Sequence, residues 1–314
     1  SLGSDLSPLL KVGKQKVSWG LGFIWNPTDY VNLQKNALDP DDPVAGRTMI
    51  LFEYPFTCGT ASGSVTAVYL PEPPEDTSPA LTLSHASTAL RAHLYWKETD
   101  IAITGGLGAE NEKDIGISFS RPFGGFIVNL EMNWSRDPLK RYYVYTSDPN
   151  TDPYFTTENE YRFAAMLGFN RFIGERGFLA GELFYDEEGY DRNQMSEYTD
   201  LFRLAASDPV TFAGVYEELA EKYVPGRLAR LYGYFSYEYR FDNDISLSGS
   251  VVHCIEDRFS YVIPALAYTG VTDTEIRMEL VVPVGNTDDG EGCLLYTSDA
   301  ADELDGVDLG GRRI

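Results

Sequence analysis

Alternation of apolar and polar side chains recurs along this chain, and it limits the possible folds more than any other feature. One side of residues 126–135 is apolar and carries Phe126, Val128, Leu130, Met132 and Trp134. The other side is polar and carries Asn129, Glu131, Asn133 and Ser135. Successive side chains of a β-strand point to opposite faces of its sheet, so this two-residue period predicts strands. We therefore expect an all-β, antiparallel protein.

The lengths of the alternating segments favour a membrane-spanning sheet. The same period appears in residues 89–97, 161–169, 228–241 and 274–284. These segments are close to the ~9–11 residues that a tilted strand needs to cross a bilayer. Strands of soluble proteins are commonly about 5–6 residues long. Counting the segments gives about 13 strands, which we interpret as an incomplete transmembrane β-barrel.

The connections between the segments alternate between short and long. Short turns are expected at residues 57–61, 98–100, 122–125, 174–177, 242–244 and 270–273. Longer links are expected at residues 22–45, 71–88, 108–112, 136–160 and 188–227. Barrels of the bacterial outer membrane have short periplasmic turns and longer extracellular loops. We therefore predict a Gram-negative outer-membrane location, with the long links outside the cell.

The longest link interrupts the pattern with a helical period in residues 195–223. Its apolar stripe consists of Phe212, Val215, Tyr216, Leu219 and Tyr223. Ser207 or Asp208 is suited to cap a helix, and Pro209 to its first position. The sequence therefore predicts a short helical insert in one outer loop, which either packs on the loops or narrows the mouth of the barrel.

The polar faces of the predicted strands supply the candidate functional residues. A water-filled lumen requires a polar lining, and its charged side chains set selectivity. The predicted pore-lining residues are Arg91, His93, Glu131, Arg162, Asn170, Glu182, Arg230, Glu238, Arg240, Glu275, Arg277 and Glu279. Because both signs of charge are present, we expect ion pairs and a transverse field rather than a simple cation or anion filter.

The N-terminal fifth of the chain contains LKVGKQKVSWGLGFIW (residues 10–25), the NPTD stretch that follows it, and RTMILFEYPF (residues 47–56). These stretches resemble a porin-like family of outer-membrane barrels that includes alginate-export-like members. The shared signature comprises Gly13, Lys14, Gln15, Trp19, Asn26, Pro27 and Asp29, with Lys14 where the family more often has Arg. The resemblance implies passive passage of small solutes or polysaccharide, and no catalysis.

The C-terminal residues 293–314 are set apart from the rest of the chain. CLLYTSDAADE and GVDLGGRRI within them resemble translated sequencing-adapter DNA. We therefore expect residues 1–292 to be an outer-membrane barrel fragment and residues 293–314 to be a non-native tail.

Composition limits the partners and the chemistry. The formal net charge of −23 argues against nucleic acid, whose affinity depends on Lys and Arg. The acidic loops lack the spacing of a calcium-binding EF-hand, and we expect no metal or cofactor. The expected partners are outer-membrane lipid, a small solute or polysaccharide, and a second copy of the chain in a homo-oligomer.

Three alternatives to a channel remain. The first is a non-conducting barrel that acts as an adhesin, assembly factor or structural protein through its acidic outer loops. The second is a soluble β-sandwich that binds carbohydrate through its 21 Tyr and 4 Trp residues. The third is a membrane hydrolase, for which His85 and Ser87 are the candidate residues; we expect no enzyme.

Overall fold

The computed structural model describes residues 7–39, 45–71, 86–108, 113–136, 140–148, 153–157, 161–208, 211–272, 274–285, 290 and 294. The first strands are β1 (Leu9–Gln15), β2 (Arg47–Cys58), β3 (Ala61–Leu70), β4 (Ser87–Trp96), β5 (Thr99–Leu107), β6 (Lys113–Phe123) and β7 (Phe126–Arg136). They are followed by β8 (Lys140–Tyr143), β9 (Tyr154–Thr157), β10 (Arg162–Ile173) and β11 (Gly177–Asp186). Two helices, α1 (Arg192–Ser207) and α2 (Ala213–Lys222), precede β12 (Leu231–Arg240), β13 (Ile245–Cys254), β14 (Phe259–Val271), β15 (Thr274–Glu279) and β16 (Val282–Val284).

One large antiparallel sheet dominates the described part of the chain. Its order is β1 to β7, then β10 to β15, and every neighbouring pair is antiparallel. β16 continues the pairing of β15 with β14, so it adds no further position across the sheet. β8 and β9 form a separate hairpin. The prediction of an all-β antiparallel fold is confirmed, and in the described residues β1 and β15 are the two open edges of the sheet.

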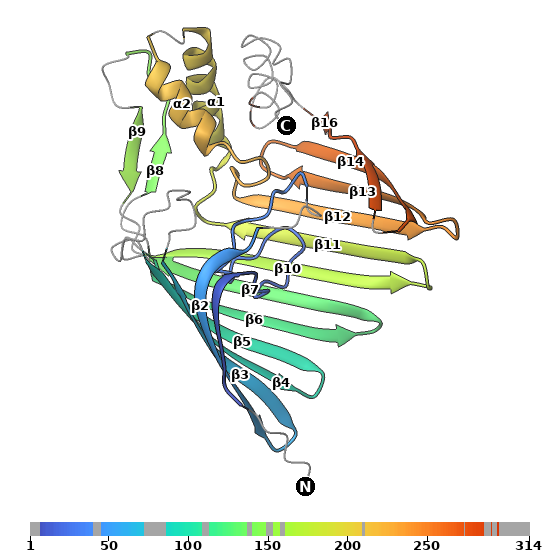
Figure 1. Ribbon diagram of the computed structural model, residues 1–314. Coiled ribbons are helices and arrows are strands. Elements are labelled where there is room, and N and C mark those ends of the chain that lie inside the picture. The colour runs from blue at the N-terminus through green and yellow to red at the C-terminus, as the bar shows by residue number, and fades with distance from the viewer. Residues whose placement is uncertain are drawn as a thin grey trace, which may run out of the picture.

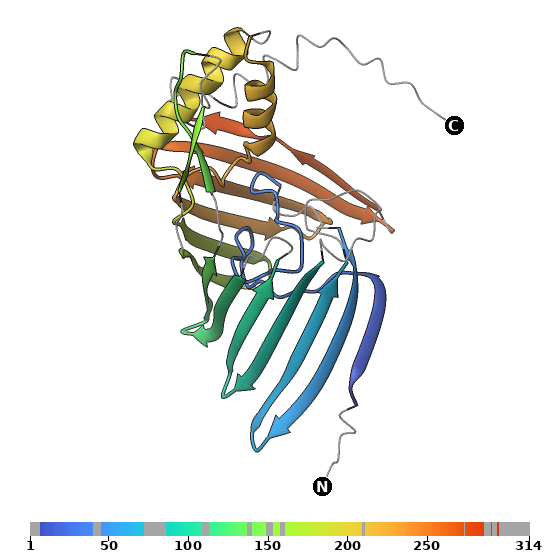
Figure 2. The same cartoon turned by 90° about the vertical axis from the view of Figure 1, so that its left-hand side faces the viewer.

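The sheet is strongly curved. Figures 1 and 2 show β2–β7 and β10–β14 as two walls that meet at an angle, with a dark-blue loop segment in the concavity between them. Short turns join the strands at one end, and the helices and the β8–β9 hairpin lie at the other. We call these ends the turn end and the loop end.

Alternation along the strands puts apolar side chains in contact with the surroundings. On the convex, outer face Leu90 is 54 % exposed, Ile115 58 % and Phe235 49 %. On the concave, inner face Glu131 is 0 % exposed, and Asn129, Asn133 and Glu182 are also buried. The outer face of the sheet is therefore apolar and exposed, while the inner face buries polar side chains together with apolar ones such as Met166, Phe184 and Tyr232.

The helical insert consists of two helices rather than one. Asp191 caps α1 by accepting hydrogen bonds from the backbone of Asn193 and Gln194. Asp208 ends α1 and also makes the contacts of the predicted helix cap, because its side chain accepts from Thr211 N at 3.2 Å and its carbonyl oxygen accepts from Phe212 N at 3.1 Å, just before α2 begins at Ala213. Pro209 lies outside the described residues.

The helices pack at the loop end through aromatic and apolar contacts. Phe212 and Leu219 of the predicted stripe are buried, and Tyr223 donates to or accepts from Tyr261 of β14 at 2.9 Å. Tyr190 lies among Tyr142, Tyr143 and Tyr198. Its burial there raises its pKa to about 12. Neither helix in the described residues is long and apolar enough to cross a membrane. The tail at 293–314 lies outside the described residues except for Leu294.

Candidate functional site

The connection between β1 and β2 lies against the inner face of the sheet. We call its residues 17–38 the inner segment. The sequence predicted residues 22–45 as a loop outside the barrel, and for the described residues up to 38 this prediction is wrong. The reason is a set of polar wall residues that bond to the backbone of the segment and hold it in the concavity (Figure 2).

Glu131 of β7 makes the first of these attachments. Its Oε1 accepts from Leu21 N at 2.5 Å, and its Oε2 accepts from Thr28 N at 3.0 Å and from Thr28 Oγ1 at 2.7 Å. A buried carboxylate is stable only where hydrogen bonds replace its water, and this one has three donors. Glu131 therefore joins two points of the inner segment to one point of the wall.

Glu182 of β11 makes the second attachment, two strands away from Glu131 across β10. It accepts from the consecutive backbone N–H groups of Phe23, Ile24 and Trp25, the last two at 3.1 and 3.4 Å. Three successive N–H groups directed at one carboxylate form an anion-binding concavity of the backbone. Glu131 and Glu182 thus bind adjacent stretches of the same segment from two different strands.

Other polar wall residues bind carbonyl oxygens of the inner segment. Asn129 Nδ2 donates to Leu21 O at 3.2 Å, and Arg91 donates to Trp19 O at 2.6 Å. Arg47, at the start of β2, donates to Val31 O at 3.0 Å. Backbone donors and acceptors of the segment are therefore satisfied by the wall, as buried peptide groups require.

Aromatic contacts fix one end of the inner segment. The ring of Trp25 stacks on Phe184 of β11 at 5.2 Å and contacts Tyr232 of β12 at 5.8 Å. Its Nε1 donates to Gly226 O at 3.1 Å. Trp25 is fully buried, so the segment is held by apolar packing as well as by hydrogen bonds.

Most residues of the family-like signature belong to this arrangement. Asn26, Pro27 and Asp29 form a tight turn in which Asp29 N donates to Asn26 O at 3.1 Å, as the Asn-Pro pair predicts. Trp19 is buried beneath Arg91, whose guanidinium carbon is 5.8 Å from the ring centre. In β1, Gly13 has φ +123, Gln15 donates to Met49 O, and Lys14 is exposed.

The predicted pore-lining residues fall at three levels of the inner face. Arg91, Glu131 and Glu182 contact the inner segment. Asn170, His93 and Glu238 lie toward the turn end. His93 pairs with Asp100 at 2.8 Å, and Glu238 pairs with Arg240 at 2.7 Å. Toward the loop end, Arg162 pairs with Glu188, and Arg230 donates to Gly189 O at 3.0 Å.

The last three predicted residues lie on the edge strand β15. Arg277 donates to Glu279 at 2.7 Å, and Glu275 is exposed on the same side of the strand. Expected ion pairs therefore form, but between near neighbours along a strand or at the loop end rather than across the interior.

Several residues of the site were absent from the predicted set. Asn129 and Asn133 flank Glu131 at a spacing of two, and this period could have identified them. Asn133 accepts from Tyr30 at 2.6 Å. Lys35, which donates to Phe23 O at 2.7 Å, lies in the segment itself, and no pattern marked it.

Other chemistries have little in the described residues to support them. His85 lies outside the described residues, and Ser87 is buried at the start of β4. Within the same residues, no group of three or more His, Cys, Asp or Glu side chains is placed to hold a metal ion. No protein-family model matches the chain, and a search of curated proteins found no match.

Proposed function

We propose that this chain forms the wall of a β-barrel in the bacterial outer membrane, through which small hydrophilic solutes or polysaccharide pass passively. The observation that carries the proposal is the exposed apolar outer face, opposite an inner face that buries polar as well as apolar side chains. Exposed Leu, Ile and Phe side chains cover the outer face, while carboxylates and amides are buried inside. Hydrocarbon outside and water inside favour this arrangement, and strands of 9–13 residues such as β5 and β14 match the thickness of a bilayer.

The proposal also places a requirement on the edges of the sheet. Unpaired N–H and C=O groups cost several kcal/mol each in hydrocarbon. The edges β1 and β15 must therefore be paired when the sheet lies in a membrane.

A non-conducting barrel is the second candidate, and the inner segment is the observation that favours it. The segment crosses the concavity at the level of Glu131 and Glu182 and is bonded to both walls. Such a segment either narrows a pore or blocks it. The two functions differ in one measurable property, the ionic current.

Planar-bilayer recording of the chain tests the choice directly. We expect a stable conductance that changes in Arg240→Glu, because Arg240 lies on the inner face with a side chain that is 74 % exposed. Arg171→Glu is the matched control, because Arg171 lies on the outer face over the ring of Phe126. An inserted protein that passes no current would support the non-conducting barrel, and equal effects of the two substitutions would contradict an inner-face pathway.

A further inference from the structure

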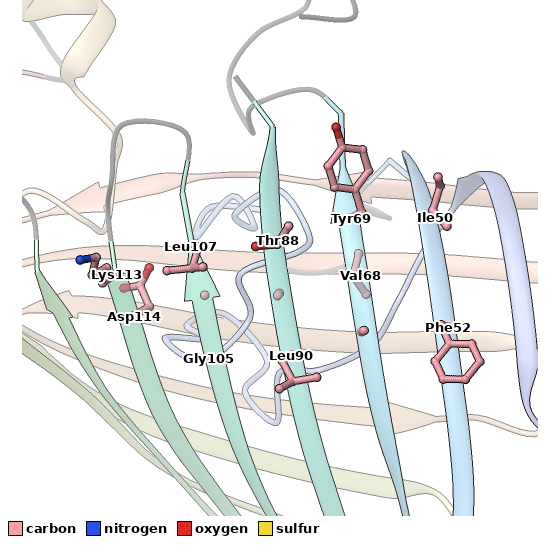
Figure 3. A pocket seen from close by; sticks show the side chains of 13 residues that line it. Ile50, Phe52, Val68, Tyr69, Thr88, Leu90, Gly105, Leu107, Lys113 and Asp114 are labelled. Carbon is pink, nitrogen blue, oxygen red and sulfur yellow. The ribbon is translucent and has the colours of Figure 1, made fainter. Parts of the chain in front are cut away.

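The outer face contains a hollow at the loop end of β2–β6. Its volume is about 600 Å³, within the ~300–1,000 Å³ that small-molecule sites commonly have. Figure 3 shows Ile50 and Phe52 of β2, Leu90 of β4 and Leu107 of β5 around it. The hollow therefore lies in the apolar surface that the proposed function assigns to lipid.

Two small residues create the hollow. Ala67 pairs with Phe52 and Leu90 across the neighbouring strands, and Gly105 pairs with Leu90 and Ile115. Side chains that face the same way on adjacent strands are neighbours, so Ala67 and Gly105 leave gaps between the larger side chains beside them. A Cβ at Gly105 would meet only Asp114 O, at 3.9 Å, so the backbone itself leaves this space open.

Two cations lie beside the hollow at the loop end. Lys113 lines it, and Arg136 is directly opposite Lys113 in the β6–β7 register. Both side chains are exposed, and Arg136 is 6.0 Å from the ring centre of Tyr161. In the ranges that the structure describes, neither forms an ion pair with an acidic side chain. Like charges directly opposite one another repel, and an anion between them would relieve the repulsion.

We propose that this hollow binds a phosphate-bearing anionic membrane lipid, with an acyl chain against Ala67 and Gly105 and the headgroup on Lys113 and Arg136. The proposal rests on the proposed function, because it requires the outer face to lie in a bilayer. The apolar gap and the cation pair are adjacent, as are the tail and the charged head of such a lipid. In a chain with a net charge of −23, a cation pair at this edge of the apolar surface provides the complementary charge.

Tryptophan fluorescence provides the test, because the four Trp residues are divided between the two faces. Trp19 and Trp25 are buried inside, while Trp96 and Trp134 are exposed on the outer face. Trp134 lies in the same cross-strand row as Gly105, next to Ile115. In Trp96→Phe protein, bromine on a lipid chain therefore quenches Trp134 when that lipid occupies the neighbourhood of the hollow.

The experiment compares vesicles of phosphatidylcholine and phosphatidylglycerol that differ only in which lipid carries the bromine. A Lys or Arg near the surface of an anionic membrane strengthens its attraction to that surface by about fivefold. We expect brominated phosphatidylglycerol to quench Trp134 more strongly than brominated phosphatidylcholine. Lys113→Gln/Arg136→Gln should abolish this preference, and Lys97→Gln/Arg171→Gln, with the same charge change at the turn end, should keep it.

A second pair of variants tests the apolar part of the site. Gly105→Leu fills the hollow and should reduce the preference, whereas Gly233→Leu adds the same side chain to the outer face of β12, where nothing lies within 4 Å. Equal quenching by both lipids, or a preference that survives both Gly105→Leu and the loss of the two cations, would overturn the lipid site and leave the membrane-embedded barrel intact. Absence of quenching by either lipid would instead contradict the proposed function.

Discussion

At the residue scale, the most informative side chains are carboxylates buried where a soluble protein would bury Leu or Val. Glu131 and Glu182 are stable there because each has three hydrogen-bond donors from the inner segment. The wall and the segment therefore depend on each other: without the segment the two carboxylates would need water, and without the carboxylates the N–H groups would lack acceptors.

Glu131→Ala should destabilise the attachment of the inner segment. It leaves the N–H groups of Leu21 and Thr28 without their acceptor, at a cost of roughly 1–3 kcal/mol each. We expect a lower urea midpoint and faster proteolysis within residues 17–38. Glu238→Ala is the control, because Glu238 shares the inner face but pairs with Arg240. An equal loss of stability in both variants would show that the contacts to the segment contribute little.

At the scale of elements, the sequence predicted strands well and the course of the loops poorly. The two-residue period that includes Leu130 and Phe235 reflects only the environment of each face of the sheet. It therefore predicts correctly which side chains share a face in the folded strands. The fold of the inner segment depends on partners more than a hundred positions away, Glu131 and Glu182, and no local pattern encodes such contacts. The two helices show the same limit, since the helical period gave the stripe of α2 and the cap before it but not α1 as a separate helix.

Removal of the N-cap of α1 should loosen that helix alone. Asp191→Ala takes away the acceptor for Asn193 N and Gln194 N, which commonly costs ~0.5–2 kcal/mol. We expect faster amide hydrogen exchange in the first turns of α1 and unchanged exchange in β10 and β11. Asp200→Ala, at an exposed position within the same helix, should have little effect. Uniformly faster exchange across the sheet would contradict an independently capped helix.

At the scale of the whole molecule, the arrangement of charge and apolar surface favours a sheet that separates lipid from water. A large sheet with Leu, Ile and Phe exposed on one face and polar groups buried on the other is poorly suited to aqueous solution. The candidate site follows from the same asymmetry, because only a polar inner face can attach a backbone segment through hydrogen bonds.

A charge on the outer face should therefore oppose insertion. Leu167 is 51 % exposed near the middle of β10, and Leu167→Arg should destabilise the protein in vesicles by ~2–4 kcal/mol. Asn170→Arg, on the inner face of the same strand, should be tolerated. The measurement is the urea dependence of unfolding in phosphatidylcholine vesicles. Equal tolerance of both substitutions would favour a water-exposed outer face and the soluble alternative.

Side chains of the sheet bind the inner segment mainly through hydrogen bonds to its backbone. Glu131, Glu182, Asn129, Arg91 and Arg47 all bond to peptide N–H or C=O groups of the segment. Peptide groups are the same whatever side chain they carry. Substitutions at exposed positions such as Leu33 and Gln34 can therefore change the surface of the segment while the hydrogen bonds to its backbone remain.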